Sequence, residues 1–227
     1  RIYIIEDSAQ SHFAYSCLCV KPHNKCCNNN RNEKYADISC YSFYPAKNLG
    51  AYGDAGLVST NNKKFYKKLL AIRNLGSIKK HIHEIIGKNT RLDTIQSIVL
   101  MKKLKSILKF NINRRTISNY YDLNLKDIKN IKLTKTMPGS SRHLYVIRTK
   151  KRDKLKKYLF KKKIFTQIHY PYSLNKLKPL KNIIKKQSLS NSENWAKECL
   201  SLPLHPNLRI SYAARVVNEI KNFFRYK

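Results

Sequence analysis

The start of the chain constrains the fold most, because an apolar run there passes directly into two acidic residues. Ile2 to Ile5 are all apolar, and Glu6 and Asp7 follow at once. A short run without polar alternation is typical of a parallel strand that is buried on both faces. In open α/β sheets, functional groups gather at the carboxyl ends of such strands. We therefore expect an α/β fold that has lost its first strands. Asp7, at the carboxyl end of this strand, is a candidate for a functional site.

Further strands and helices follow, and they fall into two parts. Apolar runs predict strands at residues 38–43, 57–60, 144–148 and 166–170. Helical spacing predicts helices at residues 62–74, 93–121 (with a bend), 153–163, 191–199 and 211–224. Gly76 is placed to end the first of these helices. We expect a large-domain portion over residues 1–112 and a small α/β domain over residues 113–227.

The net charge of +34 raises the possibility of a nucleic-acid partner. The lysines are spread over every predicted segment, however, and no helix-turn-helix, zinc-finger or RNA-recognition pattern directs the charge toward a groove. Compositional bias is therefore favoured, and basic nucleic-acid binding remains an alternative. No apolar run approaches the length needed to cross a bilayer, so no membrane partner is expected.

Cysteines crowd one polar stretch, residues 16–34. The stretch holds Cys17, Cys19, His23, Cys26 and Cys27. Spacings of C-x-C and C-C fit a tetrahedral zinc ion poorly, because zinc sites favour C-x2-C pairs with a longer spacer. We expect a reduced surface loop without metal, which indicates a cytoplasmic protein. Cys40 and Cys199 lie in apolar contexts typical of core residues.

Three motifs occur in a characteristic order. They are E-D-S-A-Q at residues 6–10, S-F-Y-P-A-K-N-L-G-A-Y-G-D-A-G at 42–56, and G-K-N-T-R-L-D-T-I-Q at 87–96. Together they resemble the DegT/DnrJ family of pyridoxal-phosphate (PLP) sugar aminotransferases, and weaker similarity continues to the end of the chain. The resemblance implies the type I PLP-dependent transferase (aspartate aminotransferase-like) fold, with part of its large domain plus its small domain.

The resemblance makes Lys47 the catalytic lysine that holds the cofactor. A lone lysine in a chain with 47 Lys and Arg residues is ordinarily a solvated surface charge, so only the motif singles Lys47 out. Some family members are dehydratases that carry His at this position. Lys47 therefore favours transamination over dehydration.

The resemblance also assigns cofactor contacts. Asp7 would lie beside the pyridine nitrogen, where a carboxylate stabilises the protonated ring. Gln10 would contact the ring or its phenolic oxygen, and Ser42 would bind the phosphate. From the residues alone, the role of a strand-terminal helix cap remains open for Asp7, and that of an ordinary buried strand serine remains open for Ser42.

Asn89 resembles the residue that reaches the phosphate bound by a neighbouring subunit, which implies a homodimer with a composite active site. Tyr44 and His169 lie where the family places groups near the sugar. A structural role for His169 is about equally well supported by the sequence.

The implied reaction moves an amino group from glutamate to a nucleotide-linked keto-deoxy sugar, for surface polysaccharide or glycoside biosynthesis. The R-L-D form at residues 91–93 is more similar to enzymes that act at carbon 3 of the sugar. An inactive truncated remnant of the family is the first alternative, since the resemblance implies that a phosphate-binding turn and a ring-stacking aromatic residue are missing. Two departures bear on contacts: Phe13 stands in a turn that usually contains glycine, and residues 173–175 lack the usual histidine.

Overall fold

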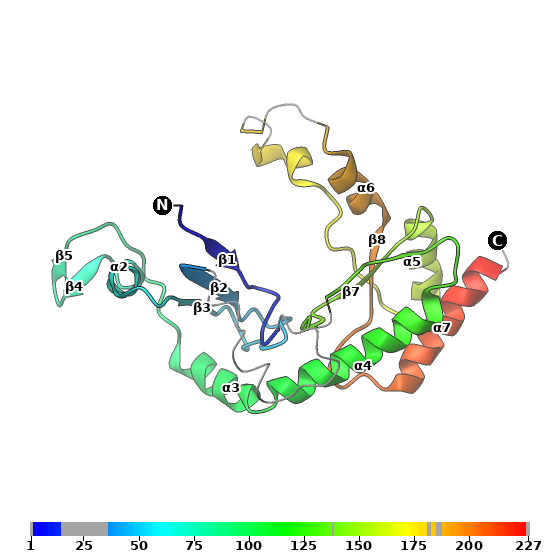
Figure 1. Cartoon of the computed structure of the whole chain (residues 1–227), viewed down its shortest axis with the longest axis horizontal. Helices are drawn as coiled ribbons and strands as arrows, with labels where there is room; N and C mark the ends of the chain where they lie inside the picture. Colours follow the sequence, from blue (N-terminus) through cyan, green and yellow to red (C-terminus); the bar gives the residue numbers. More distant parts are fainter. Residues whose placement is uncertain (1, 15–35, 138, 181–182, 185–187, 226–227) are drawn as a thin grey trace. The chain divides into compact units, whose positions relative to one another are not determined.

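The computed structural model divides the chain into two compact units (Figure 1). The first unit comprises residues 1–111 with 137–143, and the second comprises 112–136 with 144–227. We keep residue 112 as the proposed domain boundary, although residues 137–143, expected in the second domain, belong to the first unit. The structure describes residues 2–14, 36–137, 139–180, 183–184 and 188–225. The cysteine-rich stretch at 16–34 lies outside these residues.

A mixed sheet of three strands forms the centre of the first unit (Figure 1). β1 (Ile5–Asp7) pairs in parallel with β2 (Ile38–Ser42), and β2 pairs antiparallel with β3 (Gly56–Ser59). The strands predicted at 38–43 and 57–60 are thereby confirmed. The parallel register sets Asp7 opposite Cys40, so the carboxyl ends of β1 and β2 lie at the same edge of the sheet.

The prediction that the first strand is buried on both faces is wrong for this chain. Ile2 is 90% exposed and Ile5 is 68% exposed. The reason is the strand order, because β1 stands at the edge of the sheet and β2 is its only strand partner among the described residues. Regular pairing also begins only at Ile5, not at Ile2.

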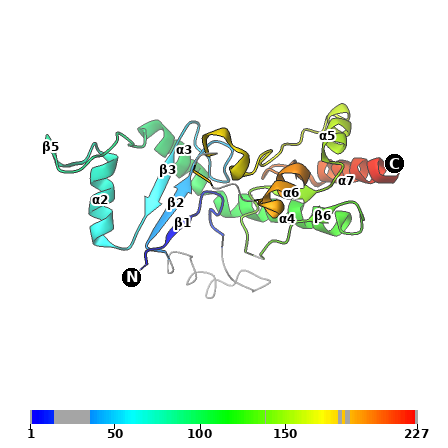
Figure 2. The same ribbon diagram turned by 90° about the horizontal axis from the view of Figure 1, so that it is seen from above.

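The predicted helices of the first unit are confirmed. α2 (Lys63–Arg73) begins at Asn62, whose side-chain oxygen accepts the N–H groups of Lys64 and Phe65. Beyond the helix, Gly76 has a φ of +77°, and a Cβ there would lie 1.6 Å from the Ile85 carbonyl oxygen. Only glycine fits this position. In both views α2 lies on the β3 side of the sheet (Figures 1 and 2).

Two features of this part of the chain differ in detail from the expectation. A short hairpin of β4 (Ser77–Lys79) and β5 (Ile82–His83) follows α2 and was not predicted. The long helix with a bend is resolved into α3 (Thr94–Leu104) and α4 (Ile107–Leu125). A small apolar core in the first unit joins these elements to the segment after β2, through Phe43, Leu49, Ala51, Leu100 and Ile107.

The second unit packs helices against an antiparallel sheet in the order β6-β7-β8. The strands are β6 (Lys132–Leu133), β7 (Tyr145–Arg148) and β8 (Cys199–Leu202). The helices are α5 (Arg152–Lys161), α6 (Ser190–Glu198) and α7 (Ile210–Arg225), with short 3-10 turns η2 (Leu174–Lys176) and η3 (Lys178–Leu180). Its core, which includes Tyr121, Ile147, Leu155, Leu200 and Val216, is nearly solvent-free.

The strand predicted at 166–170 is wrong. Only Gln167 pairs there, through two backbone hydrogen bonds with Ser201, and the chain leaves the sheet afterwards. The neighbour that Gln167 meets is β8, which the sequence analysis missed. All four β8 residues are buried, and so short an apolar run directly after a helix has no periodicity of its own.

Candidate active site

Two of the predicted cofactor-binding residues lie at the carboxyl ends of neighbouring parallel strands. Asp7 ends β1 and Ser42 ends β2. Asp7 is exposed, and one of its carboxylate oxygens accepts the N–H of Ala9 at 3.0 Å. No helix begins here among residues 8–14, so the bond is a local turn contact and not the helix cap that the sequence left open as an alternative. Because only one oxygen takes part and the side chain is exposed, this bond does not exclude a contact with a ligand.

A tight loop directly after β2 holds Lys47. The Lys47 N–H donates to the Tyr44 carbonyl at 2.8 Å, and the Ala51 N–H donates to the Phe43 carbonyl at 2.8 Å. Gly50 is required in this loop, since a Cβ there would lie 2.3 Å from the Pro45 carbonyl oxygen. The loop leaves Lys47 half-buried. We refer to residues 43–51 as the lysine loop.

α3 fixes the far end of the lysine loop. The Lys103 ammonium donates to the Gly50 carbonyl at 2.7 Å, and the Tyr52 N–H donates to Oε1 of Gln96 at 2.8 Å. Gln96 is the last residue of the third motif. The second and third motifs are therefore joined by direct hydrogen bonds in the first unit.

His12 belongs to the same site, and sequence reasoning missed it. Its side chain is buried, with its ring centroid 5.7 Å from that of Phe43 and 6.1 Å from that of Tyr41. Neither ring nitrogen reaches a partner with hydrogen-bond geometry among the described residues. Burial lowers the pKa of His12; the nearby Ser42 backbone opposes this shift and the Lys47 ammonium adds to it. The signal available in the sequence was its place two residues after Gln10.

The remaining predicted cofactor residues are less closely tied to Lys47. The side chain of Gln10 is exposed, while its backbone carbonyl accepts the Ser141 hydroxyl at 2.6 Å. Asn89 is exposed in the segment between β5 and α3, where its side-chain oxygen accepts Nε of Arg91 at 2.9 Å. Within the described part of the chain, no hydrogen bond joins Asn89 to Lys47.

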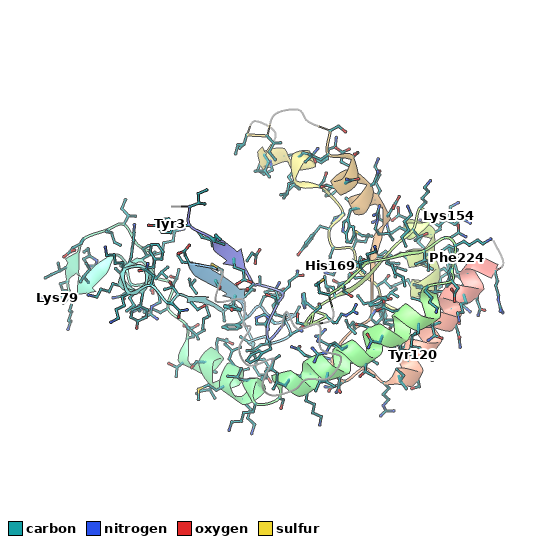
Figure 3. The ribbon with its side chains drawn as sticks, in the orientation of Figure 1. Tyr3, Lys79, Tyr120, Lys154, His169 and Phe224 are labelled. Atoms are coloured by element: carbon teal, nitrogen blue, oxygen red, sulfur yellow. The ribbon has the colours of Figure 1, made fainter. Side chains whose placement is uncertain are left out.

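The two predicted substrate residues belong to different units. Tyr44 is exposed in the lysine loop, and its N–H donates to the Ser42 hydroxyl at 3.3 Å. His169 lies in the second unit, where Nδ1 is 2.7 Å from the Ser201 hydroxyl (Figure 3). His169 thus has the structural partner that the alternative interpretation required.

A pocket of about 710 Å³ adjoins His169 in the second unit. Aromatic side chains line much of it, including Tyr170, Tyr172 and Trp195. Ser173 and Leu174, from the segment that departs from the family pattern, also line this pocket. The next residue, Asn175, donates to Glu193 at 2.9 Å.

Within the described ranges, no three His, Cys, Asp or Glu side chains gather into a cluster that could hold a metal ion. None of the helices described is both long and apolar enough to cross a membrane.

The fold is that of the aspartate aminotransferase-like class of PLP-dependent transferases, represented here by part of its large domain and its small domain. A solved structure of DesV from S. venezuelae, in complex with a ketimine intermediate, is 32% identical with a TM-score of 0.88. The match covers 98% of this chain and 58% of that one.

The chain belongs to the DegT/DnrJ/EryC1/StrS aminotransferase family, whose model matches residues 1–221. The erythromycin biosynthesis sensory transduction protein EryC1 of Saccharopolyspora erythraea is 36% identical, over 82% of this chain and 52% of that protein. A dTDP-3-amino-3,4,6-trideoxy-alpha-D-glucose transaminase of Streptomyces venezuelae is 33% identical, over 98% of this chain and 56% of that protein. The chain thus spans about half the length of these curated relatives.

PLP is the cofactor of this family, and the side chains present fit it. PLP offers a ring nitrogen, an aldehyde and a phosphate, which call for a carboxylate, an amine and hydrogen-bond donors. The first unit supplies these groups from consecutive strand ends: the Asp7 carboxylate, the Lys47 amine and the Ser42 hydroxyl. The donor set therefore matches the parts of the cofactor.

Proposed function

We propose that the whole protein is a PLP-dependent aminotransferase that transfers an amino group to a nucleotide-linked keto sugar. The observation that carries this proposal is the lysine loop, which begins at the end of β2 beside the strand end that bears Asp7. Family membership supports it, because the motif around Lys47 is where the resemblance is most specific. The product amino sugar would enter surface polysaccharide or glycoside biosynthesis.

Each residue near the strand ends has a proposed role. Bound PLP supplies an electron sink for the carbon that loses or gains the amine. Asp7 would hold the ring nitrogen in its protonated form, and Gln10 would contact the ring or its phenolic oxygen. Ser42 would donate its hydroxyl hydrogen to the phosphate. Lys47 would hold the cofactor covalently and, after its release, carry the proton to and from the reacting carbon.

The substrate proposal rests on a relative's name and on residues of the second unit. The transaminase of Streptomyces venezuelae acts on a dTDP-linked sugar aminated at carbon 3. We extend this regiochemistry to the present chain, with glutamate as the amino donor. Tyr44 and the His169 pocket would contact the sugar. Free thiols at Cys40 and Cys199 fit a protein of the cytoplasm, where nucleotide-linked sugars are expected.

A homodimer with a composite site is part of the proposal. α3 exposes large apolar side chains, which are Ile95, Ile98, Met101 and Leu104. An exposed apolar face of this kind marks an interaction surface. Asn89 lies a few residues before α3, so a partner seated on α3 would bring Asn89 close to a subunit boundary. This supports the expected contact of Asn89 with the neighbouring subunit's phosphate.

The function can be tested with glutamate and no keto sugar. An aminotransferase completes the first half of its reaction with the amino donor alone, because the amino group passes to the cofactor. We expect protein loaded with PLP to change its absorbance when glutamate is added, as the cofactor becomes pyridoxamine phosphate. The Lys47→Ala variant serves as the control and should show no such conversion on the same time scale. Retention of PLP on Lys47 without any response to glutamate, glutamine or aspartate would count against transamination.

A further inference from the structure

A group of buried polar side chains lies behind the lysine loop. Asn48, the residue after Lys47, donates from Nδ2 to Oδ1 of Asn111 at 2.8 Å and to the Ser141 carbonyl at 2.7 Å. Its Oδ1 lies 3.2 Å from Nδ1 of His143. Asn48 is 7% exposed and Asn111 is 0% exposed, so water contributes little to either amide. Hydrogen bonds of this kind are costly to break because their partners stay buried.

The same group reaches the segment that follows Asp7. Asn111 donates from Nδ2 to the His12 carbonyl at 2.9 Å, and the Ser141 hydroxyl donates to the Gln10 carbonyl at 2.6 Å. Asn48, Asn111, Ser141 and His143, which we call the amide cluster, therefore bind two backbone carbonyls of the first motif. The cluster also explains why residues 137–143 belong to the first unit.

Backbone carbonyls fix the orientation of both amides. A carbonyl can only accept, so the Ser141 carbonyl requires the NH2 group of Asn48, and the His12 carbonyl requires the NH2 group of Asn111. Each amide oxygen must then point the other way. With both of its N–H groups engaged, Asn48 presents Oδ1 to His143 as an acceptor, and this places the hydrogen on Nδ1 of the His143 ring.

We infer that Asn48 and Asn111 are positioning residues for Lys47. The amide cluster holds the base of the lysine loop against the Gln10–His12 segment, and so sets the amine that binds the cofactor relative to the strand end that bears Asp7. The catalytic importance of this arrangement rests on the proposed function. The mechanical coupling of the two segments does not depend on it.

The test uses the protein with Asn48→Ala or Asn111→Ala, and Asn113→Ala as the matched control. Asn113 lies on the same helix and also donates its amide to a carbonyl, that of Pro206 at 3.1 Å, but in the second unit. Hydrogen exchange without cofactor is followed by mass spectrometry in peptides covering the lysine loop. We expect exchange there to be at least about tenfold faster in the two cluster variants, since each leaves a buried partner unpaired, and unchanged in the control.

A second readout separates positioning from folding. In the same variants we expect at least about tenfold weaker PLP binding and a shifted absorbance maximum of the lysine-bound cofactor, whereas Asn113→Ala keeps both values. His143→Asn, which retains a donor at the position of Nδ1, should preserve them better than His143→Ala. If an alanine variant does not fold, Asn48→Ser is used in its place. Because serine keeps one hydrogen-bond donor, we expect its PLP affinity and absorbance maximum to change less than complete loss of the amide would cause.

The outcomes are distinguishable. Unchanged exchange in the lysine loop of Asn48→Ala and Asn111→Ala would overturn the inference, as would faster exchange with an unaltered cofactor spectrum and affinity. If the unsubstituted protein takes up no PLP, the proposed function fails, and the exchange data alone then decide whether the cluster couples the two segments.

Discussion

Phe13 has a backbone φ of 53°, in the left-handed region that L-residues rarely adopt. Phe13 stands in a turn where glycine was expected, and glycine is the residue that adopts a positive φ without strain. Phenylalanine can occupy the position only with strain in its backbone. The neighbouring His12 is buried, so the strained turn borders the proposed site directly.

Substitution of Phe13 measures that strain. We expect Phe13→Gly to be at least as stable as the parent, because relief of strain offsets the extra freedom of glycine in the unfolded chain. Phe13→Val should lower the free energy of unfolding by about 1–2 kcal/mol, since a β-branched residue tolerates positive φ poorly. Urea denaturation measures both. Phe165→Gly is the control at an exposed phenylalanine without positive φ and should not stabilise.

His12 makes stability depend on pH. Its pKa in the folded protein is below the ordinary value of 6.5, chiefly because of burial. The unfolded chain therefore binds a proton first as pH falls. The free energy of unfolding should decrease from about pH 6.5 down to the folded-state pKa of His12, and its contribution to the slope should vanish below that.

His12→Phe isolates this effect, because His205, whose pKa burial also lowers, stays in both proteins. Phenylalanine suits the apolar contacts with Tyr41 and Phe43 and loses no described hydrogen bond. The free energy of unfolding of the His12→Phe variant should change less between about pH 7 and pH 5 than that of the parent, because the ordinary His pKa of about 6.5 lies in this range. Identical pH slopes in the two proteins would show that His12 titrates normally.

At the scale of elements, helices with strong local sequence signals could be predicted, and short buried strands could not. Asn62 and Gly76 bound α2 by their side-chain and backbone chemistry, and α7 carries its apolar face at helical spacing. β8 has no such signal, because its four residues pair with β7, which lies about 50 positions earlier in the chain. Whether such a short segment forms a strand depends on its pairing with a distant segment of the chain.

The exposed face of α3 supports a prediction about assembly. Ile98→Asp or Met101→Asp should weaken self-association at least about tenfold, because a charge would then have to be buried in the interface. Sedimentation equilibrium measures the change. Lys102→Asp, an exposed charged position on the same helix, is the matched control and should associate like the parent. A monomeric parent protein, or Asp variants that associate equally well, would contradict the proposed dimer.

For the whole molecule, the sequence predicted the fold class and the motif residues, but it did not predict how the side chains around those motifs contact one another. Asp7, Ser42 and Lys47 were proposed as site residues from motifs, and the parallel pairing of β1 with β2 explains why Asp7 and Ser42 lie at one edge of the sheet. Asn48 and Asn111 carried no signal, because a buried amide pair joins positions 63 residues apart. His12 likewise became visible only through its burial.

The charge of +34 affects how the central claim must be tested. PLP carries a phosphate and reacts with exposed amines, so a strongly basic chain offers many sites for non-specific attachment. The nucleic-acid alternative draws on the same charge, but family membership does not favour it. A decisive experiment must therefore identify which lysine holds the cofactor.

The most direct measurement is borohydride reduction of the PLP-loaded protein, followed by peptide mapping. We predict that the label resides on the peptide containing Lys47 at near-stoichiometric yield, disappears in Lys47→Ala and persists in a control Lys63→Ala variant. Label distributed over exposed lysines, and unchanged by the loss of Lys47, would contradict the assignment of Lys47 as the cofactor lysine.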